Sequence, residues 1–411
     1  MSIFDIAKQQ ETRDAFVAAK AKSLKYKEEE LAAIKEYVLG GECERDIDRL
    51  AAGDYFLDPP QYRLIPKNFN DRKRAIYKFP GTQGTLIKLL VFAMRDIEKH
   101  YSDRLFSFRS DKTATDLLFE IRANKEISSL YVLKTDVSNY VGSIVPALLL
   151  PMLAKLYLPD DPAFYSFLEW LLTRNKVINI DGDVIDHCPG GMGGVPFGNV
   201  FMDLYLHEMD DYYENRAAFY SRYSDDILIC ARTREEIEAF EQFFYDTLER
   251  LQLHTNKDKT MILEPGEAFE LLGMELCNGK VSISRHSMEK IKRKIRKFTD
   301  RALKKRNRKD MTPDEAARML VIRYNRFFFG YSGNRKLLSW ARWAFPVIND
   351  TECLREIDHY FQNSVRYVLY GSMKKRNRSI PYKKLRELGY RSIVYYYHHQ
   401  DKISQVPELL S

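Results

Sequence analysis

Three aspartates stand where the sequence predicts the ends of strands. Asp136 ends an apolar segment that begins at Leu130, and Asp225 and Asp226 lie at the tip of a predicted hairpin between two apolar strands. Adjacent carboxylates in a tight turn repel each other, and a bound divalent cation offsets that repulsion. Two such cations can clamp the attacking and leaving oxygens of a phosphoryl transfer. An Asp-Asp pair also fits a plain turn. The catalytic interpretation therefore depends on the elements that position these residues.

Those elements are a strand, a hairpin and a glycine-rich loop. Apolar runs at residues 218–223 and 227–231 predict the two strands of the hairpin. Residues 190–198 form a glycine-rich loop that opens a predicted helix running to about residue 213. The loop lacks the Lys-Ser/Thr ending of a P-loop, which excludes that class of nucleotide site.

The charge of the chain is unevenly distributed. The 411 residues are 45% hydrophobic and 30% charged, with a formal net charge of +7. Residues 286–411 carry 29 Lys and Arg against 12 Asp and Glu, a net +17, and the preceding part carries −10. A basic region of this kind indicates a polyanionic partner such as nucleic acid, with a solvated Lys/Arg surface as the alternative.

Composition also limits where the protein works. No run approaches the roughly 18 to 20 apolar residues that span a bilayer, and the apolar share is ample for a folded core. Five cysteines are scattered without a Cys-x-x-Cys pair, which argues against a disulfide scaffold or a zinc site. No secretory signal is predicted at the N-terminus. We therefore expect a cytoplasmic protein without a membrane partner.

Seven segments between about residues 62 and 274 resemble the bacterial reverse transcriptases related to retron and group II intron enzymes. Residues 222–226, Arg-Tyr-Ser-Asp-Asp, resemble the family's Tyr-x-Asp-Asp box, and residues 136–144 resemble its first aspartate motif. Residues 194–198, Gly-Val-Pro-Phe-Gly, are similar to the loop that supports the template and the incoming nucleotide. The resemblance implies an α+β fold, a right-hand polymerase with fingers and palm followed by an α-helical basic thumb.

The implied organisation has three parts. Residues 1–60 are a helical N-terminal extension, residues 61–285 are the fingers and palm, and residues 286–411 are the basic helical thumb and C-terminal region. The third part begins with a predicted helix from Ser287 that has one apolar stripe and is otherwise mostly Lys and Arg. Such a helix binds phosphates without reading sequence.

The resemblance implies a role for each residue that matches a family motif. Asp136, Asp225 and Asp226 would hold two Mg²⁺ ions, with Mn²⁺ as an alternative, and Lys259 would protonate the leaving pyrophosphate. The residues placed beside the metals or the incoming nucleotide are Val137, Lys67, Arg74, Tyr140, Pro196 and Gly198. The residues placed on nucleic acid are Tyr223, Arg109, Leu272, Gly273, Lys290, Lys294 and Lys297.

Several of these roles have structural alternatives, and four positions depart from the family pattern, among them Ser107 where Gly is usual. Lys259 also fits a solvated surface lysine, and Lys67 and Arg74 also fit a solvated loop. Tyr140 is expected to be the steric gate against a ribose 2′-OH, with a core aromatic residue as the alternative. Val141 stands where a second aromatic residue is usual, Gly193 where Gln is usual, and Gly198 where Ser is usual.

The implied function is RNA-directed DNA synthesis from dNTPs by two-metal phosphoryl transfer. A dedicated structured noncoding RNA would be the template, DNA the product, and antiphage defence the setting. The alternatives are a retron or group II intron enzyme, template-independent or protein-primed synthesis, an RNA polymerase, and a catalytically inactive RNA-binding scaffold. A homo-oligomer or a partner protein is also compatible with the sequence.

Overall fold

The three aspartates lie on a four-stranded antiparallel sheet in the computed structural model of the chain. The structure describes residues 1–23, 26–66, 73–255, 260–332, 335–336, 339–371 and 380–403. The strand order of this sheet is β6-β7-β3-β8. Its strands are β3 (Tyr131–Asp136), β6 (Phe219–Tyr223), β7 (Asp226–Ala231) and β8 (Met261–Leu263).

The apolar runs of the sequence produce this sheet directly. The predicted hairpin is confirmed, because β6 and β7 pair antiparallel with Tyr223 opposite Asp226. In β7, residues 227–231 are all buried, as expected for a strand covered on both faces. The β3–β7 pair is also antiparallel, and its register sets Asp136 directly opposite Asp226. Two strands that are about 90 residues apart in sequence thus meet at their carboxylates.

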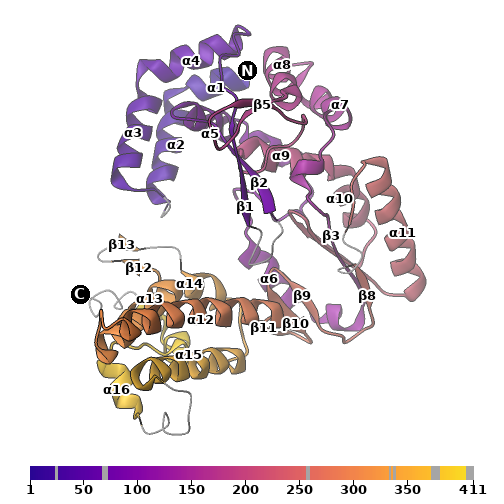
Figure 1. Cartoon of the computed structure of the whole chain (residues 1–411). Helices are drawn as coiled ribbons and strands as arrows, with labels where there is room; N and C mark the ends of the chain where they lie inside the picture. Colours follow the sequence, from indigo (N-terminus) through magenta and orange to yellow (C-terminus); the bar gives the residue numbers. More distant parts are fainter. Residues whose placement is uncertain are drawn as a thin grey trace. The chain divides into compact units, whose positions relative to one another are not determined.

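Helices α10 (His207–Glu214) and α11 (Arg234–Arg250) pack against this sheet (Figure 1). The rings of Tyr212 and Phe243 stack with centroids 3.5 Å apart and join the two helices. Thr233 begins α11 with a capping box, in which its side chain and that of Glu236 bind each other's backbone N–H. The sheet and its helices therefore form one continuous core.

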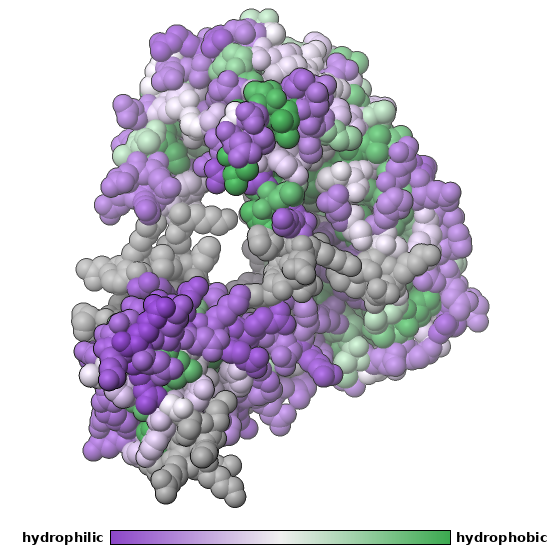
Figure 2. Space-filling model, viewed as in Figure 1, coloured by the Kyte–Doolittle hydropathy of each residue, from purple (hydrophilic) through white to green (hydrophobic). Residues whose placement is uncertain are grey.

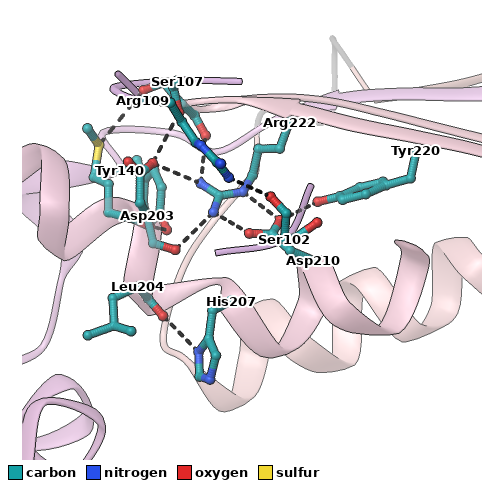
Figure 3. A network of polar contacts seen from close by, with 12 residues as sticks. Ser102, Ser107, Arg109, Tyr140, Asp203, Leu204, His207, Asp210, Tyr220 and Arg222 are labelled. Atoms are coloured by element: carbon teal, nitrogen blue, oxygen red, sulfur yellow. Dashed lines mark hydrogen bonds and ion pairs between the residues drawn. The ribbon is translucent and has the colours of Figure 1, made fainter. Parts of the chain in front are cut away.

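The glycine-rich loop is followed by a broken helix rather than the single predicted one. Helix α9 (Pro196–Tyr205) ends before α10 begins, and Leu206 between them has non-helical backbone angles. The ring nitrogen Nδ1 of His207 bonds the carbonyl oxygen of Leu204 at 2.9 Å beside this break (Figure 3).

A second sheet and a layer of N-terminal helices complete this part of the chain. The strand order of the second sheet is β2-β1-β4-β5. The strands are β1 (Gln61–Pro66), β2 (Lys73–Lys78), β4 (Lys176–Ile178) and β5 (Val184–Asp186). The remaining elements are α1 (Ile3–Lys8), α2 (Gln10–Lys22), α3 (Glu28–Leu39), α4 (Gly41–Ala51), α5 (Gln83–Ala93), η1 (Arg95–His100), α6 (Ala114–Ala123), η2 (Lys125–Ser129), η3 (Val141–Ser143), α7 (Pro146–Tyr157) and α8 (Pro162–Thr173).

The chain divides into two compact units. Unit 1 comprises residues 1–117 and 129–265, and unit 2 comprises residues 118–128 and 266–411. This division places residues 266–285 with the C-terminal helices, whereas the sequence predicts a boundary after residue 285. The assignment of fingers, palm and thumb stays a prediction.

Unit 2 combines a three-stranded sheet, in the order β11-β10-β9, with both long and short helices. Helices α12, α13 and α15 pack side by side (Figure 1). The elements are β9 (Phe269–Leu271), β10 (Met274–Cys277), β11 (Lys280–Ile283), α12 (Arg285–Asn307), α13 (Pro313–Phe329), β12 (Tyr331–Ser332), β13 (Arg335–Lys336), α14 (Trp340–Ala344), α15 (Glu352–Tyr370), α16 (Tyr382–Glu387) and α17 (Ile393–His398). The predicted basic helix from Ser287 is confirmed as α12.

Both units mix sheets with helices, so the predicted α+β class is confirmed. Within the described ranges, no helix has the length and apolar character needed to cross a membrane.

Candidate active site

The three predicted catalytic aspartates gather at one end of the β3–β7 pair. Asp136 is the last residue of β3 and only 7% exposed, and Asp226 is the first residue of β7. Residues directly opposite in an antiparallel pair have Cβ atoms roughly 4.5–5.5 Å apart, on the same face. The backbone N–H of Val137 donates to the carbonyl oxygen of Asp225 at 3.1 Å, which ties the hairpin turn to the end of β3.

This acidic set has the donor chemistry of a magnesium site. Among the residues that the structure describes, no three acidic, His or Cys side chains form a metal-holding group by themselves. Mg²⁺ is a hard cation that usually binds through one or two carboxylates and completes its shell with water and substrate phosphates. Facing carboxylates fit that mode of binding.

Arg222, the residue before Tyr223, is buried and contacts the turn between β6 and β7. Its side chain is 0% exposed, and its guanidinium binds the Asp210 carboxylate through two bonds, Nε to Oδ1 at 2.7 Å and Nη2 to Oδ2 at 2.5 Å (Figure 3). The same guanidinium donates through Nη1 to the carbonyl oxygen of Ser224 at 3.4 Å. Ser224 has φ +59°, in the left-handed region that a serine rarely adopts. We infer that the fork of Arg222 stabilises this strained turn.

The network around Arg222 is buried and reaches two more segments. Tyr220 donates its hydroxyl to Asp210 Oδ1 at 2.6 Å, and Arg222 Nη2 donates to the carbonyl oxygen of Asp203 at 3.0 Å. Ser107 donates to the Asp203 carboxylate at 3.0 Å. The motif resemblance did not reveal this network. The available signal was an arginine in an otherwise apolar strand, because a buried arginine requires a carboxylate partner.

The stability of this network is expected to depend on pH through Asp203. Burial raises the pKa of Asp203 to about 8, although Arg222 and Ser107 oppose the shift. The native state therefore keeps a proton that the unfolded chain releases near its ordinary pKa, so stability should fall as pH rises from about 4 to 8. Denaturant titrations across this range should show a smaller decline in an Asp203→Asn variant than in the wild type. Equal declines in both proteins would contradict the assignment.

The structure buries Tyr140 in the core. Its side chain is 4% exposed, and its hydroxyl donates to the carbonyl oxygen of Met202 on α9. Burial raises the pKa of this phenol well above its ordinary value. This packing agrees with the core aromatic alternative, and the steric-gate role of Tyr140 stays a prediction.

The loop residues predicted near the nucleotide lie at the start of α9. Pro196 is the first residue of that helix, and Gly198 is buried within its first turn. A Cβ atom at Gly198 would come within 2.7 Å of the carbonyl oxygen of Met192. This close approach explains why glycine replaces the usual serine. Val137 is 1% exposed, so only its backbone is available beside the carboxylates.

The predicted phosphate-gripping residues are only partly described. Arg74 lies on β2 and is exposed, opposite Ile65. Lys67 and Lys259 lie outside the described residues, so their roles stay predictions. Tyr223 ends β6 beside the aspartates and is half-buried, and burial raises the pKa of its hydroxyl.

Arg109 lies in intramolecular contacts rather than on an open surface. Its side chain is 8% exposed, and two of its nitrogens bind the Asp111 carboxylate at 2.9 and 3.1 Å. A third nitrogen donates to the carbonyl oxygen of Ser102 at 3.1 Å. In this structure Arg109 therefore holds the loop that follows η1, and its predicted contact with nucleic acid would require these bonds to open.

The remaining predicted residues lie in unit 2. Leu272 and Gly273 form the turn between β9 and β10, with φ +51° and +79°. Lys290, Lys294 and Lys297 lie on α12, where Lys297 is exposed and the other two are half-buried. The Nζ atom of Lys294 lies 3.8 Å from the centre of the Phe327 ring, and burial lowers its pKa.

Comparison with known proteins gives one family match and one curated relative. The family described as "Reverse transcriptase (RNA-dependent DNA polymerase)" matches residues 65–276, which include all three aspartates. The Retron Ec83 reverse transcriptase of Escherichia coli is 25% identical over 178 residues, 42% of this chain and 56% of that protein. The aligned part therefore spans just over half of the relative. The family uses divalent metal ions, in agreement with the donor set described above.

Solved structures that resemble this chain include two telomerases. Apo telomerase from Candida tropicalis has a TM-score of 0.47 at 11% identity, covering 85% of this chain and 63% of that one. Telomerase from Candida albicans, in complex with a fragment of telomeric RNA, has a TM-score of 0.45 at 12% identity, covering 91% of this chain and 70% of that one.

The family match extends over more than half of the sequence, and the chain therefore belongs to the reverse transcriptase (RNA-dependent DNA polymerase) family.

Proposed function

We propose that this protein is an RNA-directed DNA polymerase that makes DNA from dNTPs. The observation that carries the proposal is the register of β3 and β7, which brings Asp136 and Asp226 together beside Asp225 within the matched family region. Like charges placed opposite each other lower the stability of a fold. A catalytically inactive scaffold would gain nothing from three acidic residues at one strand end.

The reaction is an in-line phosphoryl transfer. A primer 3′-hydroxyl attacks the α-phosphorus of a dNTP, a new P–O bond forms, and the bond to the β-phosphate breaks as pyrophosphate leaves. Bound Mg²⁺ ions would activate the attacking hydroxyl and stabilise the leaving oxygen. Asp136 and Asp225 would hold these ions, with Mn²⁺ as an alternative, and Asp226 would complete the acidic site.

Other residues of the chain would act on the nucleotide rather than on the metals. Lys67 and Arg74 would bind the triphosphate, the arginine as a planar fork and the lysine as a point charge. Lys259 would give its proton to the departing pyrophosphate. Arg222 would keep the Asp225 turn in its strained conformation during this step.

Helix α12 would hold the nucleic acid by its backbone. The 23 residues of the helix span about 35 Å at 1.5 Å per residue. Lys290, Lys294 and Lys297 follow each other at spacings of four and three residues, which puts them on one face. Arg293 and Arg301 share that face, whereas the buried residues Met288, Ile291, Ile295 and Thr299 lie on the opposite side. Figure 2 shows hydrophilic residues over this part of unit 2.

Removing the basic face should weaken binding and reduce its salt dependence. In a triple variant with Ala at Lys290, Lys294 and Lys297, we expect the negative slope of log K against log[salt] for duplex DNA to become shallower, by about 0.9 for each lost phosphate contact. Fluorescence anisotropy at several salt concentrations measures the slope. Lys292→Ala is the matched control, because Lys292 lies off this face and pairs with Glu356 at 2.6 Å. An unchanged slope in the triple variant would rule out this surface.

The biological setting proposed is antiphage defence with a dedicated noncoding RNA as template. The relative named as a retron reverse transcriptase supports the retron alternative. Template-independent or protein-primed synthesis is the second candidate. Sequencing the nucleic acid that co-purifies with the protein, before and after dNTPs are added, separates these outcomes. Products that match a bound RNA support templated synthesis, and products without any RNA counterpart contradict it.

A further inference from the structure

A lysine lies within the acidic site, on the same face of the sheet as the aspartates. Lys134 precedes Asp136 by two residues on β3, and side chains two apart on a strand point to the same face. Its Nζ atom lies 2.5 Å from Oδ1 of Asp226, across the strand pair. The same nitrogen is 3.4 Å from the carbonyl oxygen of Thr135. No family motif quoted above assigns this residue a role.

The contact is well shielded from solvent. The Lys134 side chain is only 13% exposed, and that of Asp226 is 32% exposed. The register β3–β7 places Leu228 opposite Lys134, so the lysine reaches Asp226 diagonally along the pair. A cation in this position offsets the repulsion between Asp226 and Asp136, which are directly opposite.

We propose that Lys134 is a positioning residue that keeps Asp226 paired and thereby weakens the affinity of the acidic site for divalent cations. Asp136 and Asp225 then remain as the principal metal ligands, and Asp226 stays beside the lysine. The inference rests on the proposed function for its consequence in catalysis, but the metal-binding part stands on the geometry of the sheet. Two strand steps separate the Cα atoms of Lys134 and Asp136 by roughly 6–7 Å. The ammonium is bound to Asp226, directly opposite Asp136, and a dication within that range would be opposed by its charge.

The test measures metal binding without substrate. Electron paramagnetic resonance of unbound Mn²⁺ gives the dissociation constant of the purified full-length protein. Lys134→Met removes the charge with little loss of volume, and we expect the dissociation constant to fall about tenfold, from the Coulomb energy of a unit charge and a dication at this range in water. Lys134→Arg keeps the charge and should stay near the wild-type value. Lys176→Met, at an exposed pair with Asp186 on the other sheet of unit 1, is the control.

A second variant tests whether Asp226 transmits the effect. In an Asp226→Asn background, the Lys134→Met change should alter Mn²⁺ affinity less than it does in the wild type. A merely structural lysine would lower the melting temperature of Lys134→Met and leave Mn²⁺ affinity unchanged. Unchanged or weaker Mn²⁺ binding by a folded Lys134→Met protein overturns the proposal.

Activity supplies an independent consequence. If the chain is a polymerase, Lys134→Met should reach half-maximal primer extension at a lower Mg²⁺ concentration and have a lower maximal rate, because Asp226 is no longer held in place. If the wild type makes no DNA, the proposed function fails, and the Mn²⁺ measurement still decides the role of Lys134.

Discussion

Replacing Asp225 with Asn should abolish DNA synthesis while leaving the fold intact. The substitution removes one negative charge from the turn that faces Asp136 and keeps the size of the side chain. Loss of one preorganised electrostatic group costs roughly 100- to 1,000-fold in rate in other enzymes, and a metal ligand should lie at or above that range. Extension of a labelled primer on an RNA template, with purified protein and dNTPs, measures the effect.

The control for this prediction is an exposed aspartate that lies outside the site. Asp186 lies on β5, where it pairs with Lys176 at 2.6 Å, and Asp186→Asn should retain wild-type activity. Circular dichroism and melting curves should be alike for both variants and the wild type. Full polymerase activity in an Asp225→Ala, Asp226→Ala double variant would refute the proposed function.

Replacing Arg222 with Met should destabilise unit 1 by about 3–5 kcal/mol, the range for removing one partner of a buried ion pair. Asp210 is 1% exposed and would lose both bonds from the guanidinium. Its carboxylate would then be buried and would keep the bond from the Tyr220 hydroxyl. Denaturant unfolding of the purified protein, compared with the wild type, measures the loss.

Two further variants show whether the loss of the Arg222–Asp210 ion pair causes the lower stability. Arg234→Met removes an arginine whose pair with Glu238 is exposed, at 46% and 55%, and should cost less than about 1 kcal/mol. Arg222→Met combined with Asp210→Asn should recover part of the loss, because no unpaired charge is left inside. If Arg222→Met unfolds at the same denaturant concentration as the wild type, the network does not support the turn. Activity should fall in Arg222→Met even where the protein remains folded, since the Ser224 carbonyl loses a donor.

The sequence by itself determined the parts of this protein that depend on local pattern. Alternating and continuous apolar runs predicted β3 and the β6–β7 hairpin, because strand pairing across a short turn is a local event. The spacing of apolar residues from Ser287 likewise predicted α12, since a helical face repeats every three to four residues. Motif order predicted the family, and the matched range confirms it.

The tertiary structure decided which side chains face each other, because such contacts join residues far apart in sequence. Asp136 and Asp226 meet through the β3–β7 register, and a shift of one residue would turn every side chain to the other face. The same register brings Lys134 to Asp226.

Burial was the second property that only the tertiary structure supplied. Tyr140 fits a nucleotide-facing motif by sequence, yet α9 packs over it and accepts its hydrogen bond. Arg222 stands in a predicted strand without a visible partner nearby in the sequence, yet it is buried on Asp210. A motif specifies residue types and spacing, whereas exposure depends on which distant helices cover the strand. The sequence thus predicted which residues could carry the chemistry, and the packing decided which of them are buried.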